Sequence, residues 1–197
     1  MGVEQIAEGL PQVQKPLLEY TEEGGLGMTV YYKLTDEKGR TYGKTQWGPG
    51  VTHTAIGEGA DLCSDGWIHL YDSPLLAVLH TPIHANYTQP RLWECSIEGE
   101  ILREGQMKLG AKSVTTLRET PVPKVTLTQR IAYGILCSLE VCKTPAYIRW
   151  AQAWLDNTNR ADARAAWAAW TARADARAVA VAGDLDLSSI AQKAMKY

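Results

Sequence analysis

The sequence changes character at Pro121 and Pro123, and this change restricts most strongly what the chain can fold into. Before these prolines, short runs of β-branched and aromatic residues alternate with glycine, proline and aspartate, a pattern typical of short strands joined by turns. After them, apolar residues recur at helical spacing. The pattern predicts an α+β protein, with a small mixed or antiparallel sheet module followed by a helical part rich in alanine and tryptophan.

Six short segments of the first 120 residues have strand character. We expect a hairpin of 28–34 with 40–47, followed by strands over 51–55, 67–71, 91–97 and 112–119. Residues 100–110 resemble a turn-rich crossing between the last two strands. A short helix is expected from Pro74 to about His80, with Asp72 or Ser73 as its N-cap, because Pro82 should end it.

The later residues divide into helices. We expect helices over 126–142 and 144–156, then a long alanine-rich helix that contains RADARA twice, and a last short helix near the C-terminus. The predicted organisation is a flexible N-terminal arm (1–27), an α+β module (28–143) and a helical C-terminal extension (144–197). This extension either packs on the module or mediates association.

Composition limits the classes of partner. The net charge of −2 gives no overall positive field, so nucleic acid is not an expected partner. No apolar run approaches 18 residues and the N-terminus lacks a secretory pattern, so we expect no membrane association and a cytoplasmic location. The four cysteines have no metal-type or disulfide-type spacing, which is typical of reduced thiols.

All four histidines fall between positions 53 and 84. His80 and His84 have the spacing of two metal ligands on one helix face, and Cys63 and His69 could add to them. Because Pro82 interrupts the helix that this spacing needs, we predict no metal site. His80 and His84 are instead expected to serve the turn after the short helix.

Their spacing predicts that Trp167 and Trp170 share one face of the alanine-rich helix. Arginine beside tryptophan could bind single-stranded nucleic acid, but the neighbouring aspartates offset the charge. We therefore expect these tryptophans to bind a host or phage protein, or to mediate self-association through the C-terminal helices.

The motifs "WGPGVTH", "GWIH" and "PRLWE" resemble an uncharacterised family of phage and bacterial proteins that carry alanine-rich tails. The resemblance covers about residues 30–155. It brings no established activity. We expect a phage-type accessory protein of unknown biochemical activity in the host cytosol, a protein-interaction factor with a counter-defence or host-modulating role. We expect no cofactor.

A second resemblance suggests an alternative, an NAD-binding enzyme or a degenerate relative of one. The segments "VTHTA", "GWIHLYDSP" and "RLWECSIEGE" are similar to strands of ADP-ribosyltransferase-like folds. This resemblance implies that His53 holds the nicotinamide ribose and that His69 takes the place of a stacking aromatic residue. Glu119 would stabilise the positive charge that develops on the sugar. We expect His53 and His69 to line one cleft.

Three further residues are candidates for binding. They flank the two histidines in the motifs quoted above and are Trp47, Thr52 and Tyr71.

Overall fold

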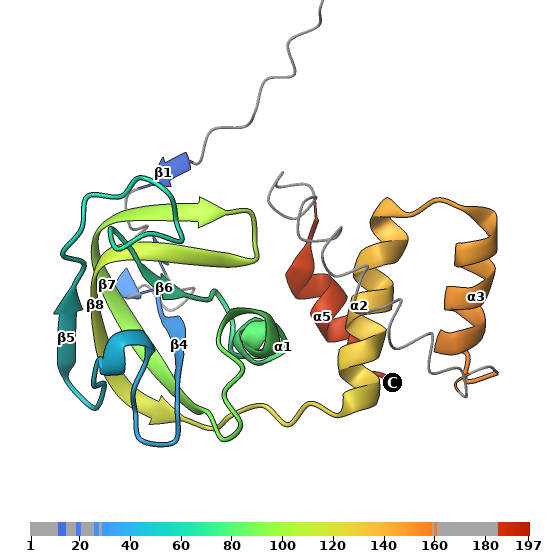
Figure 1. Cartoon of the computed structure of the whole chain (residues 1–197), viewed down its shortest axis with the longest axis horizontal. Helices are drawn as coiled ribbons and strands as arrows, with labels where there is room; N and C mark the ends of the chain where they lie inside the picture. Colours follow the sequence, from blue (N-terminus) through green and yellow to red (C-terminus); the bar gives the residue numbers. More distant parts are fainter. Residues whose placement is uncertain (1–11, 15–18, 21–25, 28, 159, 161–184) are drawn as a thin grey trace, which may run out of the picture.

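In the computed structural model of the chain, the described residues are 12–14, 19–20, 26–27, 29–158, 160 and 185–197 (Figure 1). They form a six-stranded antiparallel sheet, a separate two-stranded pair and four α-helices. The predicted α+β class is confirmed. No helix in this described part of the chain has the length and apolar character needed to cross a membrane.

The sheet contains two long strands and four short ones. Its strands are β1 (Gln12–Gln14), β4 (Tyr31–Thr35), β5 (Val51–Thr54), β6 (Ile68–Leu70), β7 (Arg91–Glu104) and β8 (Lys108–Thr120). The separate pair is β2 (Glu19–Tyr20) with β3 (Leu26–Gly27). The helices are η1 (Tyr42–Lys44, a 3-10 turn), α1 (Pro74–His84), α2 (Leu127–Val141), α3 (Pro145–Leu155) and α5 (Leu187–Ala194).

The β7–β8 hairpin is the centre of the sheet. Pairing runs from Leu92 with Thr120 down to Glu104 with Lys108, so the two strands meet at a tight turn. The expectation of a turn-rich crossing over residues 100–110 is therefore wrong. Within this range only residues 105–107 form the turn, and Gly105 adopts a positive φ of 54° there.

The bent β7–β8 hairpin closes a small barrel (Figure 1). Register shifts follow Glu94 and Glu98 in β7, and such bulges increase the bend of a strand. β4 and β1 pair with the two ends of β7, whereas β6 pairs with the beginning of β8 and β5 with its middle. Tyr71, which directly follows β6, exchanges two backbone hydrogen bonds of 2.9 Å with Tyr32 of β4. The ring β4–β7–β8–β6 is thereby closed.

The predicted hairpin of 28–34 with 40–47 is wrong. β4 pairs with β7, and residues 40–47 make only an isolated bridge between Arg40 and Gln46. The reason is local. The chain turns at 36–39 and turns again at η1, which leaves too few residues between the turns for a regular strand.

Apolar side chains fill the barrel. The interior cluster includes Trp93, the largest fully buried side chain, and its members are Tyr31, Trp47, Leu70, Trp93, Cys95, Ile101, Leu109, Ala111 and Val114. Burying one such side chain stabilises a fold by about 2 kcal/mol. We refer to this set as the barrel cluster.

Helix α1 lies between the barrel and the other helices (Figure 1). Its Ala77 packs with Leu34 and Leu92 of the barrel wall, whereas its Leu76 and Leu79 join the core of α2, α3 and α5. One short helix therefore contributes to both cores.

Helix α1 begins as expected but continues further. The Ser73 hydroxyl accepts a hydrogen bond from Leu76 N at 3.1 Å, which confirms an N-cap. The expected end near His80 is wrong, because the helix runs through Pro82 to His84. Pro82 has no N–H for the carbonyl of Val78, four residues earlier, and Arg130 Nη1 of α2 donates to that oxygen instead at 2.8 Å.

The described C-terminal helices agree with the expected pattern. Thr126 and Gln129 form a reciprocal capping box at the start of α2. The alanine-rich helix, with Trp167 and Trp170, lies outside the described residues. Within the expected N-terminal arm, residues 12–14 pair with β7 as strand β1.

Candidate functional site

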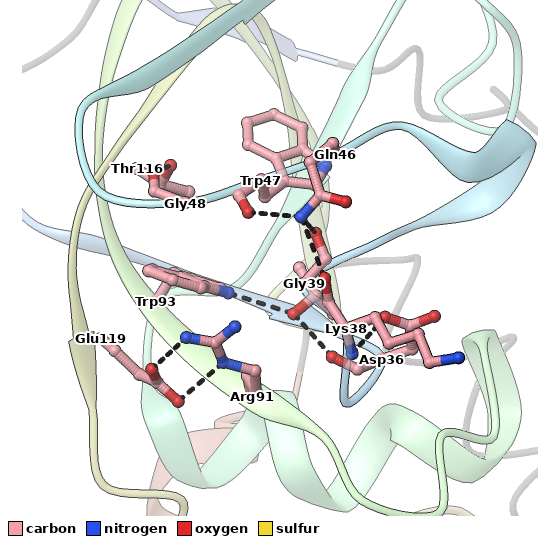
Figure 2. A network of polar contacts seen from close by, with 11 residues as sticks. Asp36, Lys38, Gly39, Gln46, Trp47, Gly48, Arg91, Trp93, Thr116 and Glu119 are labelled. Atoms are coloured by element: carbon pink, nitrogen blue, oxygen red, sulfur yellow. Dashed lines mark hydrogen bonds and ion pairs between the residues drawn. The ribbon is translucent and has the colours of Figure 1, made fainter.

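Residues 36–47, between β4 and β5, form a small hydrogen-bonded hairpin that we call the Tyr42 hairpin. Figure 2 shows the polar contacts at its base. Asp36 organises its base. The Asp36 Oδ1 atom accepts from the backbone N–H groups of Lys38 (2.8 Å) and Arg40 (2.7 Å), and Oδ2 accepts from Arg40 Nε (3.1 Å). These bonds lower the pKa of Asp36 below its usual value, with the backbone bond from Arg40 as the largest cause.

Gln46 joins the two sides of the Tyr42 hairpin (Figure 2). Its Nε2 atom donates to the carbonyl oxygens of Lys38 (2.9 Å) and Trp47 (3.0 Å). Trp47 N donates to Gly39 O at 2.7 Å. Gly39 has φ +76°, and a Cβ there would lie 2.8 Å from Trp47 O, so this close approach requires glycine.

The tip of the hairpin exposes a tyrosine. Gly43 and Lys44 have φ values of 68° and 61°, and Lys44 N donates to Thr41 O at 3.1 Å. A non-glycine residue with positive φ is uncommon and needs support from its surroundings. The Tyr42 side chain on this turn is 99% exposed. The hairpin therefore holds a large aromatic side chain in water.

Trp47 fixes the hairpin to the barrel. It is buried, and its Nε1 donates to Thr41 Oγ1 at 2.9 Å. The His53 and Trp47 rings form a T-shaped contact at a centroid distance of 4.6 Å, and His53 Nε2 lies 2.8 Å from Gln46 O. The structure thus brings together two of the residues singled out in the sequence, Trp47 and His53.

A lysine lies inside the barrel beneath this tryptophan. Lys33 is 6% exposed, and its Nζ sits 4.7 Å from the centroid of the Trp47 ring. Burial lowers the pKa of Lys33 to about 8, because a desolvated ammonium is unfavourable. Burial also raises the pKa of the neighbouring Cys95 thiol to about 12.

His69 points to the opposite face of the sheet from His53. His53 pairs with Val114, a member of the barrel cluster, and contacts Trp47 of the same cluster. The neighbours of His69, Ile68 and Leu70, pack against that cluster, so the alternation of a strand turns His69 outward. The structure does not place the two histidines in one cleft.

The outward side chain of His69 is covered by the loop at 57–66. Its Nε2 lies 2.5 Å from Leu62 O of that loop. Burial, opposed by the bond to Leu62 O and assisted by the positive charges of Lys108 and Lys33, lowers the pKa of His69 to about 4. His69 therefore acts as a neutral donor that holds the loop.

Glu119 contacts arginine and neither of the two histidines. Both carboxylate oxygens accept from Arg91, at 3.0 Å to Nε and 2.5 Å to Nη2 (Figure 2). This pairing lowers the pKa of Glu119 and raises that of Arg91. The Arg91 guanidinium also lies 4.7 Å from the centroid of the Trp93 ring. The arrangement is that of a surface pair between β7 and β8.

The remaining candidates are dispersed. The exposed Thr52 bonds Thr115 across the sheet at 2.7 Å, and buried Tyr71 packs beneath α1, where burial raises its pKa. Trp167 and Trp170 lie outside the described residues.

His80 connects three parts of the fold. Its Nδ1 lies 2.9 Å from Met107 O and its Nε2 lies 2.9 Å from Tyr133 OH, so both ring nitrogens have protein partners. Among the described residues, no group of three or more histidine, cysteine or acidic side chains has a geometry that could hold a metal ion.

Sequence reasoning missed Tyr42, Lys33 and the pair formed by Lys108 with Cys63. For Lys33 a signal existed. It lies two residues from the buried Tyr31 and two from the buried Thr35 on one strand, so its side chain must point to the same face as theirs. Tyr42 precedes a glycine in "TYGKT", which is a turn signal, but this signal lies inside residues 40–47, where a strand is expected. The contact of Lys108 with Cys63 joins residues 45 apart and has no sequence signal.

Comparisons with known proteins identify no relative. The chain matches no family model, curated protein or solved structure.

Proposed function

We propose that this chain is a protein-binding module and that the Tyr42 hairpin (36–47) carries its contact surface. The observation that supports this most strongly is the 99% exposure of Tyr42 on a hairpin that many hydrogen bonds hold in place. Covering an exposed tyrosine ring with a partner removes apolar surface from water, which favours binding. Tyrosine is also among the residues that most often dominate protein–protein binding.

The hydrogen bonds of the hairpin support binding because they reduce its entropic cost. A loop that is already ordered loses little conformational freedom when a partner contacts it. The bonds of Asp36 and Gln46 order the base, and buried Trp47 attaches that base to the barrel. The tip is ordered by the backbone hydrogen bonds from Thr41 N to Thr45 O and from Lys44 N to Thr41 O.

The chemistry of the tip indicates the kind of partner. Tyr42 and Lys44 are both exposed, which combines an aromatic ring with a positive charge. A protein pocket that is apolar at its floor and acidic at its rim would complement both groups. The partner would be a host or phage protein, as expected for an accessory factor, or a second copy of this chain.

The alternative as an NAD-dependent enzyme has weaker support. It requires His53, His69 and Glu119 to act on one substrate. His53 faces the barrel cluster, His69 is covered by the 57–66 loop, and Glu119 is paired with Arg91. No specific contact favours the alternative.

Photo-cross-linking in cells tests the proposal. The photoreactive amino acid p-benzoylphenylalanine replaces Tyr42 in one variant and Ile56 in a control variant. Ile56 is a suitable control because it is also a surface side chain, 97% exposed, outside the hairpin. Adducts are separated by gel electrophoresis and identified by mass spectrometry.

The proposal predicts a discrete protein adduct from position 42, whether to another protein or to a second copy of this chain. The adduct should diminish when unlabelled wild-type protein is added in excess. If position 42 gives no adduct, or the same diffuse adducts as position 56, the proposal is wrong.

A further inference from the structure

A loop on the outer face of the barrel, residues 57–66, lies directly on strand β8. Its Leu62 is 2% exposed and packs with Trp67 and Leu102. A Cβ at Gly110 of β8 would lie 2.5 Å from Leu62 Cδ1, so glycine at this position lets the loop approach the strand closely. The loop is therefore a packed cover on this face of the sheet.

Cys63, next to Leu62, contacts a buried lysine of β8. Lys108 is 3% exposed, and its Nζ lies 2.8 Å from Cys63 Sγ. Cys63 itself is exposed. A solvent-accessible thiol and an amine are thus in contact, although they are 45 residues apart in sequence.

Neighbouring contacts hold this pair in place. Lys112 Nζ donates to Gly66 O at 3.0 Å and lies 4.1 Å from the centroid of the Trp67 ring. On the other side, His69 bonds Leu62 O. Because the loop is fixed at both flanks, Cys63 Sγ and Lys108 Nζ stay close to one another.

We propose that Cys63 and Lys108 form a reversible covalent cross-link when the protein meets a peroxide. The thiol of the exposed Cys63 reacts first, because oxidation of cysteine depends on access of the oxidant. The resulting sulfenic acid lies beside a primary amine, and sulfenic acids condense with nitrogen nucleophiles.

The two steps balance. In the first, the sulfur attacks hydrogen peroxide, the O–O bond breaks, and the products are Cys63–SOH and one water. In the second, the neutral amine of Lys108 attacks the sulfur, an S–N bond forms, the S–O bond breaks, and a second water leaves. Sulfur loses two electrons, the peroxide gains them, and the protein loses two hydrogen atoms overall. A thiol reductant reverses the bond.

The other cysteines differ in ways that make them controls. Cys95 and Cys137 are buried, so a peroxide does not reach them readily. Cys142 is partly exposed, but its Sγ contacts Thr144 Oγ1 at 3.7 Å, and the amine of the adjacent Lys143 bonds Leu139 O. Cys142 therefore has access without a neighbouring free amine.

The experiment is intact-mass and peptide analysis of the folded full-length chain after hydrogen peroxide treatment. We expect a protein mass lower by two hydrogens and a tryptic species that joins residues 45–91 to residues 104–112. Trypsin should no longer cleave after Lys108. Dithiothreitol should restore the starting mass, and the cross-link should raise the melting temperature.

Three variants complete the test. C63S and K108R should not lose the two hydrogens, C142S should behave as wild type, and K108R should label more strongly at Cys63 with dimedone, a probe for sulfenic acid. If wild-type protein shows no joined peptide after peroxide treatment, the proposal is wrong, whether or not K108R folds well. Equal dimedone labelling of Cys63 in wild type and K108R would also contradict it.

Discussion

Lys33 Nζ donates a hydrogen bond of 3.0 Å to the backbone carbonyl oxygen of His69, joining β4 to β6 through the inside of the barrel. The bond places a titratable amine in an apolar interior, next to the ring of Trp47 and the thiol of Cys95. Because burial lowers the pKa of this amine, the stability of the fold depends on pH.

Stability should rise with pH through Lys33. The pKa of this amine is about 8 in the folded protein and 10.5 as its ordinary value, so the unfolded chain binds more protons between these limits. The free energy of unfolding should rise by up to about 1.4 kcal/mol per pH unit in this range. Urea unfolding at pH 7.5, 8.5 and 9.5 measures it.

The variant K33M isolates this contribution from other groups. Above pH 9 the Cys95 thiol acts in the opposite direction, because its pKa of about 12 in the fold lets the unfolded chain lose the proton first. The free energy of unfolding of wild type minus that of K33M should therefore become more positive as pH rises. A constant difference would show that Lys33 is not desolvated in the folded protein.

Acid should weaken the fold through His69. Its folded pKa of about 4 lies below the ordinary value of 6.5, so its stabilising contribution is complete above pH 6.5 and is lost as pH falls toward 4. The loss amounts to about 3 kcal/mol at most. Over this range H69Q, which keeps a donor for Leu62 O, should lose correspondingly less stability than wild type in chemical unfolding. Parallel acid curves for the two proteins would contradict the assignment.

A double-mutant cycle should detect coupling between Arg130 and Pro82. Replacing Arg130 by Met leaves the Val78 carbonyl without its donor and should cost about 1–2 kcal/mol of stability. In a P82A background the backbone N–H at position 82 can serve that oxygen, so the same replacement should cost about 1 kcal/mol less. Equal costs in both backgrounds would mean that the hydrogen bond contributes nothing.

NAD should leave the melting temperature unchanged. A ligand at 100 times its dissociation constant would stabilise the fold by about 2.7 kcal/mol, which thermal unfolding detects easily. We expect no shift because His53 and His69 face opposite sides of the sheet. A shift that disappears in H53A would favour the enzyme alternative instead.

Local signals in the sequence predicted the fold class and most elements. The Ser73 cap, the strand at β5 and the helix at α2 each follow from a short run of residues. The partner of β4 was missed because strand pairing depends on residues far apart in the sequence, as when Leu34 of β4 pairs with Leu92 of the neighbouring strand β7. Local propensity carries no information about such pairing.

The end of α1 also depends on a residue far away in the sequence. Pro82 is a strong signal for the end of a helix, but Arg130 supplies the missing hydrogen bond from another helix. A sequence pattern cannot reveal that compensation.

The candidate site was predictable only in part. Trp47 and His53 were singled out and lie in contact, while His69 was expected beside them and faces away. The error arose from treating neighbouring strands as one surface without knowing their register. A bulged, closed barrel changes which residues face the interior.

The most direct test of the binding proposal is the affinity of the purified partner, once identified by cross-linking, for Y42A and I56A, measured by isothermal titration calorimetry. We predict that Y42A weakens binding by about 30-fold or more, equivalent to about 2 kcal/mol, while I56A changes it by less than about 3-fold. Circular dichroism should show both variants folded, because each removed side chain is almost fully exposed. Unchanged affinity in Y42A, or an equal loss in I56A, would contradict the role of the Tyr42 hairpin.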